Sequence, residues 1–495
     1  MQEAKKFALD VGITFIASVL SVIFASLIGI LLGRYLGPTD LGLYKMTVMF
    51  YGIASLIGAL GIPASMIKYV AEYKKDKIAF NKIVSSGLIT SLVMGLILSM
   101  LIYSYSFLFA SLFKMPELES LLSLLSPVFF FVLLNAGLFG ILNGLRQMKK
   151  YAAASIFQSI LLILFTLGFF YFYPNIISAI AGLVLSTMGT TLFLIFVSRK
   201  SLHIDLENFI KTTKMLLGFG IQTLGTNLVN MINLQADTFF IGFFLDAKEV
   251  GYYAAATGIS RFFWVAPQAI QTISYPAISE YWAKRNIPGL ELMVDRSMRY
   301  AALALIPLGM MMGLFSSEII TWIYGQEFFN SSLSLQILLV GTIFFGIFFT
   351  SIGGALAGAN RPDLSLKAAS LGAGLTIILN IILVPNFGIV GAAIATTSSL
   401  MIFACLYYVL TIRTMRLNLN LKWLTKMIIA SLIGVSIYVL LRDVINQNLL
   451  RFCILSIFTG LSVVILFPRE DIYLAKSLTR SFKIENIINN LQRRN

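Results

Sequence analysis

One basic residue, Arg261, lies well inside an apolar stretch, where a charged side chain is costly unless it has a function or a partner. Gln268 and Gln271 follow it at roughly helical spacing, so we expect the three side chains to lie on related faces of one helix. A guanidinium flanked by amides suits recognition of a phosphate or an anionic sugar. The structural alternative is that Arg261 pairs with a carboxylate on a neighbouring helix.

A polar stripe runs through the apolar segment 215–245, because its members are spaced four, four, three and four residues apart. They are Gln222, Thr226, Asn230, Asn233 and Asp237. Segment 8–32 carries a similar stripe formed by Asp10, Thr14, Ser18 and Ser21. We expect the two stripes to line a cavity in which hydroxyls and amides bind sugar. The alternative is that they hold packed helices together by hydrogen bonds.

Two carboxylates in the apolar segments are candidates for binding a coupling ion, either a proton or Na⁺. Asp237 could instead form an ion pair with Arg261, and Glu318 could instead lie at the membrane interface. A further charged group, formed by Arg34, Asp40 and Lys45, is expected to cluster at the outer mouth, where a solvated group of helix-end charges is the simpler interpretation.

The sequence shows no pattern typical of an enzyme. It lacks a phosphate-binding loop, a zinc-protease motif and a nucleophile elbow, so we expect neither ATP hydrolysis nor other catalysis. Cys405 and Cys453 lie in apolar runs and give no metal-ligand spacing, and the one histidine, His203, has no ligand partners nearby in the sequence. We therefore expect no metal and no cofactor other than the possible coupling ion.

The composition places the whole chain in a membrane. Of its 495 residues, 58% are hydrophobic and 12% are charged, and the mean hydropathy is +0.87. Soluble domains carry about 25% charged residues, so lipid must surround much of this surface. The net charge of +15 then indicates a face that meets anionic lipid, not a nucleic-acid-binding surface.

The predicted fold is an all-α membrane protein with about fourteen transmembrane helices. The expected spans are 8–32, 41–65, 83–110, 119–143, 151–173, 176–198, 215–245, 250–278, 298–324, 332–358, 364–385, 388–412, 424–441 and 449–467.

The basic residues predict the orientation of these helices. With the N-terminus inside, 30 of the 37 Lys and Arg residues fall on inner segments and six on outer ones, with Arg261 inside a span. Positive residues accumulate on the cytoplasmic side of membrane proteins. The sequence therefore predicts a multi-pass protein of the cell membrane with both termini cytoplasmic.

An internal repeat divides the chain into two lobes. Residues 33–44 match residues 242–253 at an offset of 209, through two glycines, a leucine, an acidic residue and a tyrosine. The offset pairs each helix with the sixth one after it, so the halves have the same orientation and are expected to be related by an axis along the membrane normal. The expected units are a lobe of helices 1–6, a lobe of helices 7–12, helices 13–14, and a basic cytoplasmic tail; their ranges are 1–200, 201–415, 416–467 and 468–495.

Four stretches give the chain a resemblance to a known family. They are the run Leu-Gly-Arg-Tyr-Leu-Gly-Pro-Thr-Asp-Leu-Gly-Leu-Tyr at 32–44, and the segments 236–242, 354–362 and 385–393. In this order and spacing they resemble the polysaccharide transporters, the Wzx-type flippases of the MATE-like superfamily of multidrug, oligosaccharidyl-lipid and polysaccharide exporters. The resemblance covers helices 1–12.

The resemblance implies translocation of a lipid-linked oligosaccharide or polysaccharide precursor across the cytoplasmic membrane by alternating access between the lobes. The expected partners are this substrate and membrane lipid, with proteins of glycan assembly as further candidates. One alternative is an ion-coupled multidrug exporter of the same superfamily, against which the buried Arg261 argues. A second alternative is a membrane polysaccharide polymerase or ligase, against which the short outer loops argue.

Overall fold

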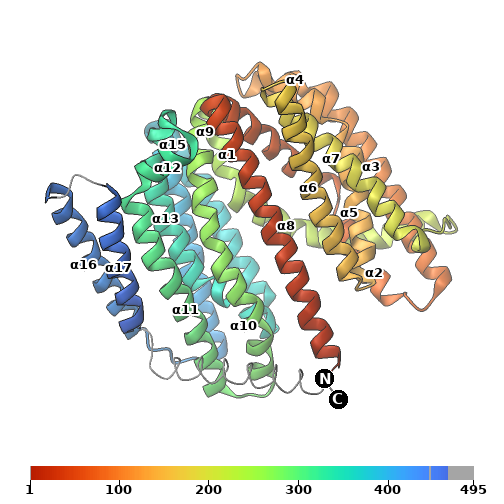
Figure 1. The fold of residues 1–495 in the computed structure, drawn as a ribbon. Helices are drawn as coiled ribbons and strands as arrows, with labels where there is room; N and C mark the ends of the chain where they lie inside the picture. Colours follow the sequence, from red (N-terminus) through yellow and green to blue (C-terminus); the bar gives the residue numbers. More distant parts are fainter. Residues whose placement is uncertain (1, 445–447, 467–495) are drawn as a thin grey trace, which may run out of the picture.

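The computed structural model describes residues 2–444 and 448–466, and every regular element in these ranges is helical. Figure 1 shows two groups of steeply inclined helices with α1 between them. The first helices in chain order are α1 (Gln2–Gly58), α2 (Ile62–Glu72), α3 (Lys77–Leu112), α4 (Glu117–Leu125), α5 (Val128–Gly144), α6 (Met148–Phe172) and α7 (Ile176–Ser198). After the short turn η1 (Arg199–Ser201), α8 (Phe209–Phe244) links this group to the second one (Figure 1).

The second group contains helices that are broken more often. In chain order it comprises α9 (Ala247–Ser260), η2 (Arg261–Trp264), α10 (Val265–Ala283), α11 (Ile287–Leu314), α12 (Ser316–Tyr324), η3 (Gln326–Asn330), α13 (Ser331–Phe348), η4 (Thr350–Ile352), α14 (Ala355–Gly358) and α15 (Pro362–Met415). Two further helices, α16 (Lys422–Val444) and α17 (Asn448–Leu466), lie at the edge of this group farthest from α3 and α5 (Figure 1).

The expected transmembrane segments are present. Nine described helices are long and apolar enough to cross a membrane, or ten when the pair α4 and α5, bent by 44°, is taken as one span. Two of them, α1 and α15, each contain two expected spans, because each is kinked at a glycine with positive φ: Gly37 (83°) and Gly388 (58°). The broken helix α9–η2–α10 and the short helix α17 account for the remaining two, so all of the about fourteen expected spans have a helical counterpart.

One expected boundary was wrong. The sequence predicts a loop before residue 298, but α11 begins at Ile287. The added turns bury Leu290 and Val294, and Asp295 accepts hydrogen bonds from Arg299 on the next turn and from the indole of Trp423. Asp295 and Arg299, two of the charges that suggested a loop, thus pair within α11, and the indole of Trp423 binds Asp295 from α16. The predicted tail, 468–495, lies outside the described residues.

The repeat motifs meet where α1 packs against α9. A Cβ atom built on Gly42 lies 1.7 Å from the carbonyl oxygen of Ala247, and one built on Gly251 lies 1.8 Å from that of Pro38. Because the offset of 209 relates Gly42 to Gly251 and Pro38 to Ala247, these two contacts are equivalent. Such reciprocal contacts are the signature of a twofold-like relation between the repeats. Glycine at both positions lets the two backbones touch.

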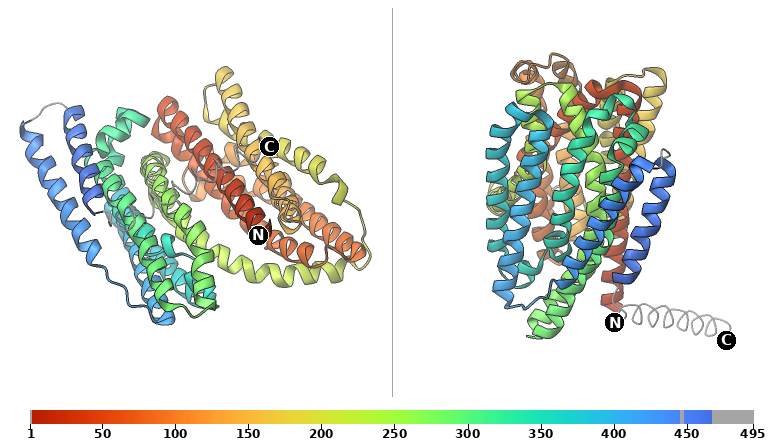
Figure 2. Two further views of the ribbon diagram at one scale, coloured as in Figure 1. Left: turned by 60° about the horizontal axis from the view of Figure 1, so that its bottom comes forward. Right: turned by 90° about the vertical axis from the view of Figure 1, so that its left-hand side faces the viewer.

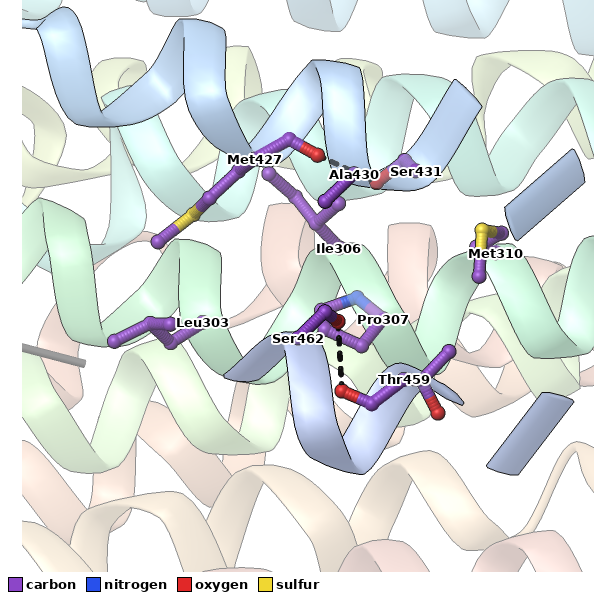
Figure 3. A pocket seen from close by; sticks show the side chains of 9 residues that line it. All are labelled: Leu303, Ile306, Pro307, Met310, Met427, Ala430, Ser431, Thr459 and Ser462. Carbon is purple, nitrogen blue, oxygen red and sulfur yellow. Dashed lines mark hydrogen bonds between the residues drawn. The ribbon is translucent and has the colours of Figure 1, made fainter. Parts of the chain in front are cut away.

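The last two helices attach to the rest of the protein through α11. A pocket of about 20 Å³ lies beside Pro307 of α11. Figure 3 shows Ser431 of α16 and Thr459 and Ser462 of α17 among the side chains that line it. Ser431 donates to the carbonyl of Met427 and Ser462 to that of Thr459, so both hydroxyls are satisfied within their own helices. In the left-hand view of Figure 2, α16 and α17 lie at the far edge of the second group, away from the first group of helices.

Candidate functional site

A cavity of about 320 Å³ lies between α1, α8 and α9–η2–α10, at the junction of the two groups of helices. We call it the central cavity. Its polar lining residues are Ser26, Lys45, Gln235, Thr238, Thr257, Arg261 and Gln268. Trp264 and Tyr324 contribute aromatic walls. Lys45 and Arg261 make it cationic, and among the described residues no Asp or Glu lines it.

Arg261 reaches the central cavity because α9 ends directly before it. The chain continues as the tighter turn η2, which begins at Arg261, and becomes α-helical again at Val265. The guanidinium donates from Nη2 to the backbone carbonyl of Leu234 on α8, with an N–O distance of 2.7 Å. It forms no ion pair with any residue that the structure describes, so most of its five N–H donors are available to a ligand.

Lys45 is placed differently from the expectation. The sequence groups it with Arg34 and Asp40 at the outer mouth, but its side chain lines the central cavity together with Arg261. The kink at Gly37 redirects α1, so that Lys45 faces inward while Arg34 donates to the carbonyls of Trp322 and Ile323 at the end of α12. Asp40 is half-buried on the second part of α1 and does not line the cavity.

The two glutamines that follow Arg261 point to different places. Gln268 lines the central cavity, as expected. Gln271 points elsewhere, since its Nε2 atom lies 2.1 Å from a Cβ atom built on Gly353, in the corner between η4 and α14. Glycine at position 353 therefore makes room for the Gln271 side chain, which has a packing role.

The polar stripe of α8 does not line one surface. Gln222, Thr226 and Asn230 are exposed on the stretch of α8 that links the two groups of helices, outside the central cavity. Asn233 donates to the carbonyl of Ala369 on α15 at 3.1 Å, so it holds two helices together. The residues of α8 that do line the cavity, Gln235 and Thr238, lie on the adjacent face.

The stripe on α1 follows the same pattern. Ser21 is hydrogen-bonded to Ser159 of α6 at 2.8 Å, and Ser18 is exposed and donates to the carbonyl of Thr14. Neither lines the central cavity, whereas Ser26 does. The structural alternative, helix-to-helix hydrogen bonding, therefore describes Ser21 and Asn233.

The two candidate ion-binding carboxylates have different surroundings. Asp237 is 4% exposed and accepts hydrogen bonds from the hydroxyl of Tyr253 at 2.7 Å and from the backbone N–H of Thr238 at 2.7 Å. It forms no ion pair with Arg261 in the described structure. Glu318 lies in the first turn of α12 and accepts a hydrogen bond from Ser317, as an acidic residue at a helix N-terminus commonly does.

Sequence reasoning missed several residues of the central cavity, among them Ser26, Thr238, Thr257, Trp264 and Tyr324. A weak signal was available on α1, where Val22, Ala25, Ser26 and Gly29 recur at helical spacing one residue beyond the serine stripe. No sequence pattern indicated that Tyr324, at the end of α12, packs into the space above Gly33.

The comparisons with known proteins agree with this architecture. The uncharacterized membrane protein MJ1068 of Methanocaldococcus jannaschii is 24% identical, over 90% of this chain and 94% of that protein. The probable low-salt glycan biosynthesis flippase Agl15 of Haloferax volcanii is 29% identical, over 46% of this chain and 48% of that protein. The solved structure of the lipid II flippase MurJ in an inward closed conformation has the same fold, with a TM-score of 0.74, 21% identity, and coverage of 94% of this chain and 100% of MurJ.

The family comparison is more specific than these individual similarities. The model of the family described as polysaccharide biosynthesis protein matches residues 7–282, which comprise α1 to α10 and include most of the residues of the central cavity. The chain is thus a multi-pass membrane protein that belongs to the polysaccharide biosynthesis protein family.

Proposed function

We propose that this protein is a flippase, which moves a lipid-linked glycan across the membrane by alternating access, and that it is not an enzyme. The observation that carries the proposal is the pair of cations, Lys45 and Arg261, in a central cavity that no described carboxylate lines. A guanidinium and an ammonium bind the oxygens of a phosphate linkage through charge-assisted hydrogen bonds. Relatives named as flippases, such as Agl15, support the assignment.

An apolar groove near the central cavity suits the lipid part of such a substrate. It has a volume of about 560 Å³ and lies between α11, α13 and α16, with a lining that is apolar except for Gln336 and Ser431. The ring of Trp264, in the wall of the central cavity, lies tilted by 42° against that of Phe345 on α13, with the ring centres 5.7 Å apart. Ile347, two residues after Phe345, lines the groove. The cation pair thus suits the phosphate of a lipid-linked glycan, and the groove suits its lipid chain.

The cation pair also weighs against the first alternative, an exporter of cationic drugs. A cationic drug would be repelled from a cavity that contains Lys45 and Arg261, and binding it would require carboxylates in the lining. The second alternative, a polymerase or ligase, needs an acceptor site outside the membrane. The loops between the described helices are too short to form a folded domain.

We infer that Asp237 binds the coupling ion, a proton or Na⁺. It is a buried carboxylate on the helix that links the two groups, and its neighbours Tyr253 and Thr396 supply hydroxyl oxygens, the ligand type that hard cations prefer. Glu318, near the end of the helical bundle, is a weaker candidate for this role. The two repeats, 1–200 and 201–415, act in this proposal as the lobes that rock around the central cavity.

The proposed orientation, with both termini cytoplasmic, predicts opposite accessibility for two loop positions. Lys75, in the turn between α2 and α3, and Lys248, in the first turn of α9, are both exposed and are expected on opposite sides of the membrane. In a chain whose native cysteines are replaced (Cys405→Ser, Cys453→Ser), Lys248→Cys should react with an impermeant maleimide in intact cells and Lys75→Cys only after lysis. Reaction of Lys75→Cys in intact cells would reverse the orientation.

Replacing Lys45 by methionine should weaken the binding of pyrophosphate to the purified protein by roughly tenfold or more, because a hydrogen bond to a charged group contributes about 1.5–3 kcal/mol. Methionine keeps a similar side-chain length and removes the ammonium group, whose Nζ lies 3.9 Å from a Cβ atom built on Gly29. Isothermal titration calorimetry in detergent measures the change. Lys248→Met, at an exposed lysine outside the cavity, is the matched control and should bind as the unmodified protein does. Equal affinity of Lys45→Met and the control would argue against the anion site.

A further inference from the structure

The short helix α12 packs over one end of the central cavity. Tyr324, its last residue, lines the cavity and is 5% exposed. A Cβ atom built on Gly33 of α1 would lie 2.6 Å from the Tyr324 ring, and one built on Gly258 of α9 would lie 3.0 Å from its hydroxyl oxygen. The ring thus lies between α1 and α9, the helices through which the two repeats meet. Figure 1 shows α9 and α12 near the end of the molecule opposite to the N-terminus.

Arg34 holds the C-terminal end of α12 in this position. Its Nη1 atom donates to the backbone carbonyls of Trp322 and Ile323. The last carbonyls of a helix have no partner within the helix and carry a partial negative charge, so a cation beside them is stabilising. Arg34 follows Gly33 in the chain. The same turn of α1 therefore supplies both the space for the Tyr324 ring and the cap of α12.

Both ends of α12 are suited to movement. The helix has nine residues and begins after a break at Phe315. It ends at Gly325, whose φ of 109° and ψ of 167° lie in a region that is essentially restricted to glycine. A Cβ atom built on Gly325 meets nothing within 4 Å, so the backbone conformation and not close packing requires glycine here. Breaks of this kind let a short helix change its angle while α11 and α13 keep theirs.

We propose that α12 is the outer gate of the central cavity, where outer follows the proposed orientation. Tyr324 is the residue that closes the gate, and Arg34 is a positioning residue that holds it shut. The gate opens when Arg34 releases the two carbonyls and the Tyr324 ring leaves the space at Gly33. This proposal rests on the proposed function and deepens it, because alternating access requires an exit on the side opposite to the entrance.

The first test measures how fast an impermeant maleimide reaches the cavity from outside intact cells. The reporter is Ser26→Cys, at a residue that lines the cavity, in the chain with Cys405→Ser and Cys453→Ser. Tyr324→Ala should raise the labelling rate roughly tenfold or more, since the closed state loses the packing of a buried aromatic ring. Arg34→Gln should also raise the rate. Arg34→Lys should raise it less, because lysine keeps a cation at the helix end.

Trp322→Ala is the matched control for this test. It removes an aromatic side chain from the same helix, but Trp322 is 79% exposed and does not line the cavity, so the reporter should label at the unmodified rate. Tyr324→Phe keeps the ring and should label much more slowly than Tyr324→Ala. Equal labelling rates in Tyr324→Ala and Trp322→Ala would overturn the gate.

A reversible lock separates gating from a purely structural role. In the same chain without native cysteines, Gly33→Cys with Tyr324→Cys places two thiols across the contact and removes the ring that a side chain at position 33 would meet. A short bifunctional thiosulfonate should join the two thiols and stop translocation in proteoliposomes, and a reductant should restore it. Failure of the thiols to join, or equal translocation before and after joining, would contradict the gate.

The outcomes separate this proposal from the proposed function. If the unmodified protein moves a lipid-linked glycan and the joined variant moves it equally well, only the gate is wrong. If the unmodified protein moves no lipid-linked glycan, the proposed function is wrong, and the labelling rates still show whether Tyr324 closes the cavity.

Discussion

Replacing Arg261 by alanine is expected to lower glycan translocation by roughly 10- to 100-fold while the protein still folds and inserts. The large effect follows from the loss of one of the two cations that face the central cavity. Folding should persist because, among the residues that the structure describes, Arg261 donates only to the Leu234 carbonyl, which keeps its place in α8. Arg261→Lys should recover part of the activity, since lysine keeps the charge and loses the planar fork of donors. The measurements are translocation in proteoliposomes and membrane-protein abundance.

The double variant Arg261→Ala with Asp237→Ala separates a binding role from an ion-pair role. Removal of both members of a buried ion pair is often tolerated, whereas removal of one is strongly destabilising. Because Asp237 is bonded to Tyr253 and Thr238 instead of Arg261, the double variant should be at least as inactive as Arg261→Ala. Recovery of both abundance and translocation in the double variant would show that Arg261 has a structural role.

Replacing Gly42 or Gly251 by valine is expected to abolish the closed contact between α1 and α9. The first side-chain carbon would lie 1.7 or 1.8 Å from a backbone carbonyl oxygen, a position that no rotamer change can relieve. Overpacking of this kind commonly costs about 1–3 kcal/mol, and more when backbone must move. Because the two contacts are equivalent under the repeat, we expect the two variants to have similar effects on the melting temperature and on translocation.

A matched control for these variants is Gly374→Val. Gly374 lies within α15, has an ordinary helical φ, and a Cβ atom built on it meets nothing within 4 Å. It therefore tests the effect of adding a β-branched residue to a long apolar helix without the steric overlap. Loss of stability in Gly374→Val equal to that in Gly42→Val would contradict the importance of the close contact.

Much of the fold could be predicted from the sequence because a membrane imposes a simple rule. Each crossing needs about 20 apolar residues, and the hydropathy pattern shows them directly. The match between 33–44 and 242–253 also indicated two related halves, and the reciprocal contacts of Gly42 and Gly251 now give that match a physical reason. The start of α11 was missed because Asp295 and Arg299, which neutralise each other, are indistinguishable in sequence from loop charges.

The candidate site could be predicted less completely. Helical spacing identifies a polar face but not the helix that it meets, so Asn233 and Ser21 were assigned to the cavity although they bond to α15 and α6. Lys45 was placed at the mouth because the sequence gives no angle for the kink at Gly37. Arg261 was identified because a charge in an apolar segment requires an explanation wherever its neighbours lie, and Gln268 was identified because it follows Arg261 at helical spacing.

The most direct test of the account is translocation by the purified protein in liposomes without ATP. A fluorescent lipid-linked oligosaccharide joined through phosphate is placed in both leaflets, and a membrane-impermeant quencher reports the fraction that reaches the outer leaflet with time. The account predicts that liposomes with the unmodified protein lose nearly all fluorescence, whereas protein-free liposomes and those with Arg261→Ala lose about half. Loss of about half with the unmodified protein, or equal loss with Arg261→Ala, would contradict it.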